Sequence, residues 1–149
     1  MPDRSERAES TPGARTSPPR VLIDSSVWID YYRPGPAAAL RSAVIDGLTQ
    51  DAVFTMPLIV AEVVQGAPDE ETLETLLDDF HALRQIEVGF EVGKRAARIG
   101  YAMRRLGNPT PTADLLIAAA ALAADSELWH RDVHFTQIAR VAPLRERRL

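Results

Sequence analysis

Residues 21–30 read Val21-Leu22-Ile23-Asp24-Ser25-Ser26-Val27-Trp28-Ile29-Asp30. The uninterrupted apolar triplet predicts a short buried strand, and the spacing of apolar residues from Val27 to Tyr32 predicts a helix directly after it. Asp24 stands at the junction of the two. An acid at the edge of an apolar segment is costly to bury unless it is paired or bound to a cation. Asp24 is therefore a candidate functional residue.

Three more acids hold comparable positions next to apolar segments. Glu62 interrupts the segment 58–64, Asp114 opens the run 115–124, and Asp132 follows the segment 128–131. One acid of this kind is common. Four of them at the edges of four core elements indicate a cation that they share.

Beyond this stretch, short apolar segments alternate with amphipathic ones. We expect strands at 21–23, 52–55, 85–88 and 127–130, and helices at 27–32, 36–48, 57–65, 69–83, 91–106, 111–124 and 135–140. Thr110 is expected to cap the helix in which Pro111 occupies the first turn. Alternation of strands with helices predicts an α/β domain with a parallel sheet covered on both faces. Function in such sheets gathers beyond the carboxyl ends of the strands, where Asp24 and Asp132 fall.

The first 20 residues differ from the rest of the chain. They contain four prolines, seven charged residues and almost nothing apolar. Such a segment cannot bury enough surface to offset the entropy of ordering it, so we expect a disordered tail at 1–20 and one folded domain at 21–149. Val21 is a second candidate for the start of translation, because valine codons can serve as initiators.

Composition narrows the chemistry. The chain has no cysteine, so a thiolate metal site is excluded, and oxygen ligands favour Mg²⁺ or Mn²⁺. No apolar run approaches the ~20 residues needed to span a bilayer, and no signal peptide is evident, which predicts a cytoplasmic protein without a membrane partner. Carboxylates that hold one or two such cations suit phosphodiester hydrolysis by metal-activated water.

The net charge of −4 argues against simple attraction to nucleic acid, but the basic residues are grouped. Five of them share the polar face of the helix at 91–106. They are Lys94, Arg95, Arg98, Arg104 and Arg105. Both a solvated face and a strip that contacts phosphates remain open. His130 likewise suits either a structural role or a contact with phosphate or metal.

Four blocks of the sequence, in this order, resemble the PIN-domain ribonucleases, and more narrowly the VapC toxins of VapBC toxin–antitoxin modules. The blocks are VLIDSSVWID (21–30), AEVVQG (61–66), TADLLIAAA (112–120) and HRDVHFTQI (130–138). The resemblance covers about residues 21–140. It implies a PIN-like three-layer α/β/α sandwich with a mainly parallel central sheet. It also implies a Mg²⁺- or Mn²⁺-dependent endoribonuclease, with a VapB-type antitoxin as partner and RNA as substrate, tRNA being the leading candidate.

The same resemblance assigns roles to individual residues. Asp24, Asp114 and Asp132 would be the main metal ligands, and Glu62 would complete the catalytic cluster or orient a metal-bound water. Ser26 matches the small hydroxyl residue that supports the first acid. Some relatives carry a further acid two positions after the fourth, where this chain has His134, and we expect His134 to be a surface residue.

Two alternatives stand beside this interpretation: a PIN-domain nuclease that acts alone in RNA processing, and a non-catalytic interaction module. A haloacid-dehalogenase phosphatase is disfavoured because Ser26 occupies the place of its second aspartate, and a nucleotide-binding loop is disfavoured because 24–27 contains no glycine. The apolar helices around Trp28 and 73–83 predict a homodimer. An antitoxin that sends a basic side chain toward the acids would lower the activity.

Overall fold

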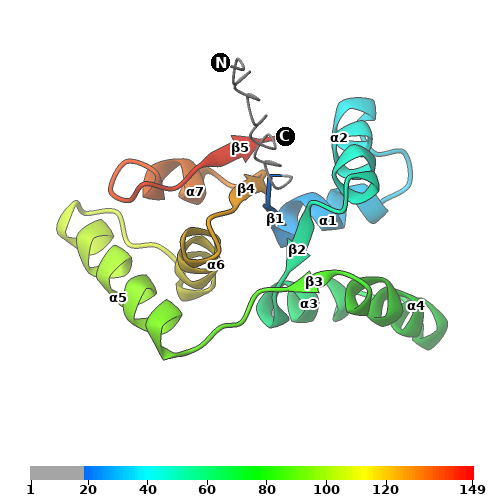
Figure 1. Cartoon of the computed structure of the whole chain (residues 1–149), viewed down its shortest axis with the longest axis horizontal. Helices are drawn as coiled ribbons and strands as arrows, with labels where there is room; N and C mark the ends of the chain where they lie inside the picture. The colour runs from blue at the N-terminus through cyan, green and yellow to red at the C-terminus, as the bar shows by residue number, and fades with distance from the viewer. Residues whose placement is uncertain (1–18) are drawn as a thin grey trace, which may run out of the picture.

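The computed structural model describes residues 19–149, which form one five-stranded parallel sheet in the order β3-β2-β1-β4-β5 and seven helices (Figure 1). The strands are β1 (Val21–Ile23), β2 (Val53–Thr55), β3 (Arg84–Gln85), β4 (Glu127–His130) and β5 (Glu146–Arg148). The helices are α1 (Ser25–Tyr32), α2 (Ala38–Thr49), α3 (Pro57–Val64), α4 (Glu70–His81), α5 (Phe90–Arg105), α6 (Thr112–Ala123) and α7 (Val133–Ile138). The predicted α/β architecture is confirmed. Of the predicted tail, residues 1–18 lie outside the described part of the chain.

The order of the strands explains the two helical layers. The chain steps from β1 to β2 to β3 in one direction, returns to the other side of β1 to form β4, and continues outward to β5. Because crossovers between parallel strands are right-handed, the two directions place their helices on opposite faces. Helix α1 packs against α2 and α3, α3 packs against α4, and α6 packs against both α5 and α7.

The core lies where β1 and β4 meet the central helix α6. Leu22, Ile23 and Leu128 are fully buried in the two strands, and the alanines at 118–121 of α6 are fully buried as well. Four consecutive small residues keep α6 narrow on every side, so the sheet and the neighbouring helices can pack closely against it. Val21 pairs with Glu127 and Ile23 with Trp129, so the carboxyl ends of β1 and β4 lie next to each other.

Some predicted boundaries were wrong. The N-cap position of α6 is held by Pro111 without a side-chain hydrogen bond, whereas Thr110 donates its hydroxyl to the carbonyl of Asn108, 3.3 Å away. The third strand is only Arg84–Gln85, and α7 begins at Val133, two residues earlier than expected. β5 is an edge strand with little apolar cover, and its three residues are all charged. It was not predicted because it has no apolar pattern.

The helices that suggested a dimer do leave some apolar side chains exposed, namely Ile29, Tyr32 and Leu77. Trp28 and Phe80 are buried against each other, with ring centroids 5.2 Å apart. The most exposed large apolar side chains are Phe90, Tyr101 and Leu106, in or beside α5. The homodimer remains a prediction. Within residues 19–149, none of the helices has the length and apolar character to cross a membrane.

Candidate metal centre

Asp24 links the end of β1 to the start of α1. Its backbone N–H donates to the carbonyl of Trp129 in β4 at 2.9 Å, which continues the pairing of the two strands. Its side chain caps α1, with Oδ2 accepting from the backbone N–H of Ser26 at 3.0 Å and also from the Ser26 hydroxyl. Asp24 is only 4% exposed. The carboxylate is therefore held in one orientation at the edge of the sheet.

Ser26 joins two loops that are far apart in sequence. While its hydroxyl donates to Asp24, the same oxygen accepts from the backbone N–H of Arg131 at 3.0 Å. The Arg131 side chain pairs with Asp30 of α1 at 2.7 Å. Ser26 thus connects the loop after β4 to the start of α1. Its supporting role in the site stays a prediction.

Asp114 approaches the same place from the first turn of α6. Its Oδ2 lies 2.8 Å from Nδ1 of His134, which belongs to α7. Nδ1 of His134 lies 3.3 Å from Oδ1 of Asp132. One ligand atom from each of Asp114, Asp132 and His134 can be chosen so that all three lie within 4.8 Å of one another. His134 was expected to be a surface residue. Its side chain is about one-third exposed, but because α7 begins at Val133 it also contacts two of the acids.

Asp132 caps α7, and its own backbone is hydrogen-bonded to the buried side chain of His130. Its Oδ1 accepts from the backbone N–H of His134 at 2.9 Å, and its own backbone N–H donates to Nδ1 of His130 at 3.2 Å. His130 is fully buried and its Nε2 lies 2.5 Å from Oε2 of Glu146 in β5. Since Nδ1 of His130 accepts, Nε2 carries the proton and donates to Glu146. His130 therefore has a structural role.

The charges of the three aspartates affect one another. Burial raises the pKa of Asp24 above its ordinary value of 3.8; hydrogen bonds from Ser26 oppose the rise and the charge of Asp132 adds to it. Burial is also the main reason why the pKa of Asp114 is raised, with the His134 hydrogen bond opposing and the charges of Asp132 and Asp24 adding. Asp24, Asp114 and Asp132 therefore share one electrostatic environment.

Glu62 stands apart from this group. Within residues 19–149 it forms no side-chain hydrogen bond or ion pair with the three aspartates, and its Oε2 is buried without a partner. It lines a hollow of about 460 Å³ together with Tyr32 and Arg33. Its helix α3 contacts both α1, which Asp24 caps, and α6, which carries Asp114. The role of Glu62 in the cluster stays a prediction.

The residues fit a divalent cation. Among the described residues, no lysine or arginine lies within 4.0 Å of the carboxylates of Asp24, Asp114 and Asp132, and only His134 pairs with two of them. Buried carboxylates without a counter-charge are unfavourable, and a bound cation would relieve both the burial and the mutual repulsion. Asp114, Asp132 and His134 lie close enough together to offer oxygen and nitrogen ligands to one ion, and Asp24 lies outside this group but adds to its negative charge.

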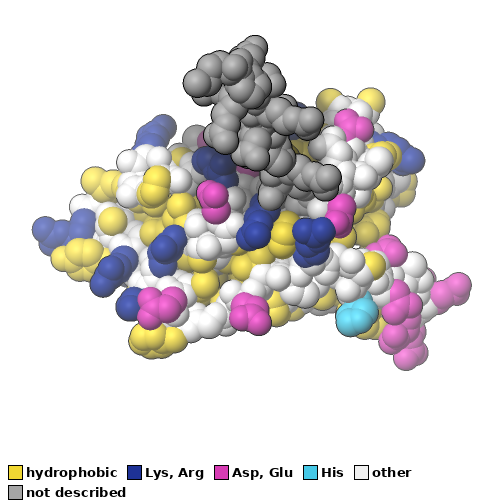
Figure 2. All heavy atoms as spheres, viewed as in Figure 1, with side chains coloured by type: hydrophobic (Ala, Val, Ile, Leu, Met, Phe, Trp, Pro, Cys, Tyr) yellow, Lys and Arg dark blue, Asp and Glu magenta, His cyan; other side chains and the backbone are white. Residues whose placement is uncertain are grey.

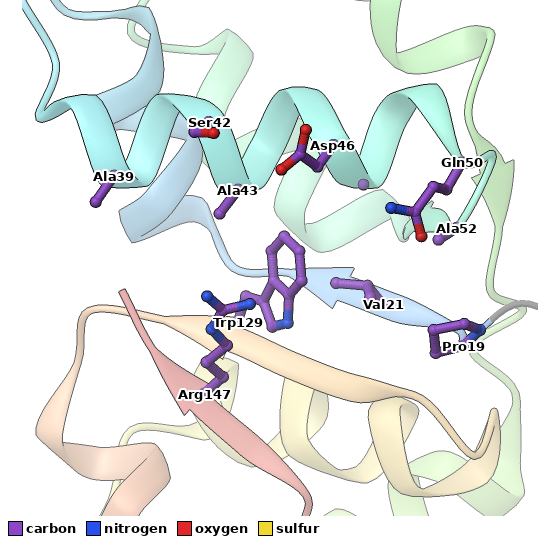
Figure 3. Close-up of a pocket in the computed structure, with 11 residues that line it drawn as sticks. Pro19, Val21, Ala39, Ser42, Ala43, Asp46, Gln50, Ala52, Trp129 and Arg147 are labelled. Atoms are coloured by element: carbon purple, nitrogen blue, oxygen red, sulfur yellow. The ribbon is translucent and has the colours of Figure 1, made fainter.

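A separate cavity of about 440 Å³ lies between α2 and the sheet (Figure 3). Trp129 and Arg147 point into it from β4 and β5, with the guanidinium carbon 5.1 Å from the centre of the indole ring, and Asp46 faces them from α2. Among the described residues that line it, there is no cluster of acids or histidines that could bind a metal ion. The chemistry of the described chain therefore gathers at the carboxyl ends of β1 and β4.

Two residues at or behind the site escaped sequence reasoning. His134 stands two positions after Asp132, and that spacing was a usable signal. Glu146 gave no signal, because its partnership with His130 depends on an edge strand made only of charged residues.

The PIN domain family profile matches residues 21–141. A VapC ribonuclease of Mycobacterium bovis is 33% identical over 127 residues, which cover 83% of this chain and 95% of that protein. Ribonuclease VapC18 of Mycobacterium tuberculosis is 26% identical over 123 residues, or 80% of this chain and 87% of the relative. The fold is similar to VapBC2 from Rickettsia felis bound to a promoter DNA fragment. That match has a TM-score of 0.70 and 16% identity, and it covers 87% of this chain and 98% of the other. VapC20 of Mycobacterium tuberculosis, described as a sarcin–ricin loop cleaving toxin, matches with a TM-score of 0.61 and 13% identity over 78% and 93% of the chains.

Proposed function

The chain belongs to the PIN domain family, and from that premise we propose that it is a divalent-cation-dependent endoribonuclease, the toxin of a VapBC-type pair. One observation carries the proposal. Asp24, Asp114 and Asp132, distant in sequence, share one environment at the carboxyl ends of β1 and β4, and His134 pairs with two of them. Surplus negative charge of this kind is suited to a cation that acts on phosphodiesters.

Each residue of the site would have a separate role. Asp24, Asp114 and Asp132 would hold Mg²⁺ or Mn²⁺, which lowers the pKa of a bound water and stabilises charge on the phosphate. Ser26 would keep the Asp24 carboxylate oriented, since its hydroxyl donates to that carboxylate. Glu62, whose Oε2 is buried without a partner, would complete the cluster or orient a water.

The basic face of α5 supports an RNA substrate. Basic side chains, one lysine and several arginines, gather over α5 at the left of the molecule (Figure 2). The helix carries five basic residues and one acid, although the whole chain has a net charge of −4. Gly100 of α5 packs so closely on Leu115 that an added Cβ would lie 2.7 Å from its Cδ1, and Leu115 directly follows Asp114. This contact shows that α5 packs against α6, but the basic face lies elsewhere: Lys94, Arg95 and Arg98 line a hollow with Ala123, at the opposite end of α6 from Asp114. The basic face would therefore bind phosphates away from the cleaved bond.

We propose structured RNA with a single-stranded loop as the substrate class, with tRNA as the leading candidate. Stacking and base contacts require unpaired bases, whereas A-form helices hide most of their base edges. Sequencing the 5′ ends of cellular RNA after induction would identify the cleaved molecule. An unchanged set of 5′ ends would contradict the proposed activity.

A VapB-type antitoxin would occupy the hollow beside Glu62. Solved relatives with this fold are complexes of VapB with VapC, as in Salmonella typhimurium. In this chain the hollow is lined by partly exposed Ile29 and Tyr32, and it reaches Glu62, so an apolar segment that ends in a basic residue would fit. We also propose a homodimer, which light scattering at micromolar concentration would test; a stable monomer would contradict it.

The decisive experiment compares RNA cleavage by the wild type and by Asp24→Asn. Asparagine can still cap α1 and accept from Ser26, so the fold should persist while the ligand charge is lost. Cleavage should fall to background in this variant and in wild type treated with EDTA. Asp46→Asn, at an exposed acid of α2, is the matched control and should keep full activity. Full activity in Asp24→Asn or in EDTA would refute the metal mechanism.

Growth provides the test of the toxin role. Induction of the wild type should arrest growth, and Asp114→Asn should not. A small open reading frame directly upstream, where the genome has one, should restore growth on co-expression if it encodes the antitoxin. Arrest by Asp114→Asn would instead favour a non-catalytic interaction module.

A further inference from the structure

His134 places a nitrogen atom among the oxygen atoms of the acidic cluster. Its Nδ1 lies 2.8 Å from Oδ2 of Asp114 and 3.3 Å from Oδ1 of Asp132. These two acids come from different helices, so the imidazole lies at the contact between α6 and α7. The position is fixed by the backbone, because the N–H of His134 donates to Oδ1 of Asp132 at 2.9 Å. The ring is about one-third exposed, so its nitrogen is reachable from solvent.

This nitrogen has a defined chemistry in the arrangement observed. Both carboxylates are acceptors when ionised, so Nδ1–H donates a hydrogen bond to Asp114 when no cation is present. A neutral imidazole that carries its proton on Nε2 instead offers a lone pair at Nδ1. The same atom can therefore exchange a hydrogen bond to the acids for a bond to a cation, without a change in its net charge.

Nitrogen and oxygen ligands do not suit the same ions equally. Mg²⁺ prefers an octahedron of oxygen ligands and gives up its water reluctantly. Imidazole suits the later first-row transition ions best; Mn²⁺ is the first and weakest binder of that series, but as a transition ion it accepts a nitrogen ligand more readily than Mg²⁺ does. A site made of Asp24, Asp114 and Asp132 alone would suit Mg²⁺. The imidazole of His134 increases the affinity of the same site for transition ions relative to Mg²⁺.

We infer that His134 is a metal ligand through its imidazole nitrogen, and that it makes this centre prefer Mn²⁺ over Mg²⁺. The inference rests on the proposed function, since it specifies which cation that function uses. It assigns a role to a residue that sequence reasoning had placed on the surface.

The test measures binding rather than cleavage. Isothermal titration of the full chain with Mn²⁺ and with Mg²⁺ gives the ratio of the two dissociation constants for wild type, His134→Asn and His81→Asn. Asparagine replaces the ring nitrogen by a neutral oxygen, so the charge of the site is unchanged. His81 lies exposed near the end of α4 and provides the same chemical change away from the acids. The preference for Mn²⁺ should fall by about tenfold or more in His134→Asn and stay constant in His81→Asn.

A spectroscopic measurement on the wild type needs no variant. Pulsed electron paramagnetic resonance of bound Mn²⁺ should show hyperfine coupling to a directly bonded ¹⁴N, and the coupling should be absent in His134→Asn and present in His81→Asn. Mn²⁺ bound to the wild type without ¹⁴N coupling, or an equal ion preference in wild type and His134→Asn, would overturn the ligand assignment and leave the nuclease proposal intact. Failure of both ions to bind the wild type would overturn both.

Discussion

Glu146→Ala should destabilise the protein through a residue buried behind the candidate site. Glu146 of β5 accepts a hydrogen bond from Nε2 of His130 at 2.5 Å, and His130 is fully buried. Removal of the carboxylate leaves the Nε2–H of His130 without a partner inside the protein. The opposite ring nitrogen accepts from the backbone N–H of Asp132, so the defect is transmitted to the loop that carries this acid.

The size of the effect follows from the type of hydrogen bond. A hydrogen bond to a charged group contributes about 1.5–3 kcal/mol, and a buried donor left unsatisfied costs about 1–3 kcal/mol. The two ranges describe the same loss, so we expect the free energy of unfolding to fall by about 2 kcal/mol. For a domain of this size, that change lowers Tm by about 4–8 °C.

Equilibrium unfolding in urea measures the change, with Glu146→Gln as the matched variant. Glutamine keeps an acceptor oxygen for His130, so Glu146→Gln should lose less than about 1 kcal/mol. Glu146→Ala should also weaken Mn²⁺ binding, because Asp132 is less firmly placed. A free energy of unfolding for Glu146→Ala within about 0.5 kcal/mol of wild type would refute the reasoning.

Three further outcomes follow from the same structure. Asp24→Asn should raise the thermal stability of the metal-free protein at pH 7 and abolish its stabilisation by Mn²⁺; a lowered Tm for the metal-free variant would contradict this. The pKa values of Asp24 and Asp114 are raised above 3.8 in the folded state, which therefore binds more protons than the unfolded chain. The contribution of these two acids to stability should be largest at acidic pH and should be lost as the pH rises from about 4 through their raised pKa values. Urea unfolding between pH 4 and 8 would detect this trend. The trend should be smaller in Asp24→Asn. The double variant Arg95→Gln, Arg98→Gln should raise KM for RNA with little change in kcat. It should also reduce the slope of log affinity against log salt by about 0.7 for each phosphate that is no longer neutralised. Arg41→Gln on α2 should change neither KM nor the salt slope.

The parts of the site that were predictable depend on local patterns. Asp24 and Asp132 follow apolar strands, and parallel strands present their carboxyl ends at one edge, so their approach could be expected. Asp114 was placed correctly in the first turn of its helix. These inferences needed only the periodicity of apolar residues and the order of the elements.

The parts that escaped depend on tertiary contacts. The contacts of His134 with the acids were missed because α7 was expected to begin at Phe135, which left His134 in a loop. β5 carries no apolar pattern, since its stability comes from backbone pairing with β4 and from one buried contact to His130. The start of α6 shifted because Pro111 itself occupies the cap position, so Thr110 donates elsewhere.

The order of the strands in the sheet also determines when this protein can become active during its synthesis. Asp24 is synthesised early, whereas Asp114 and Asp132 come from the last third of the sequence. The hydroxyl of Ser26 cannot accept its hydrogen bond until Arg131, 105 residues later, has been added. A nascent chain that has folded β1, β2 and β3 still lacks two of the acids and the strand that brings them together. A chain that ends before Asp114 therefore lacks two of the acids on which the proposed activity depends.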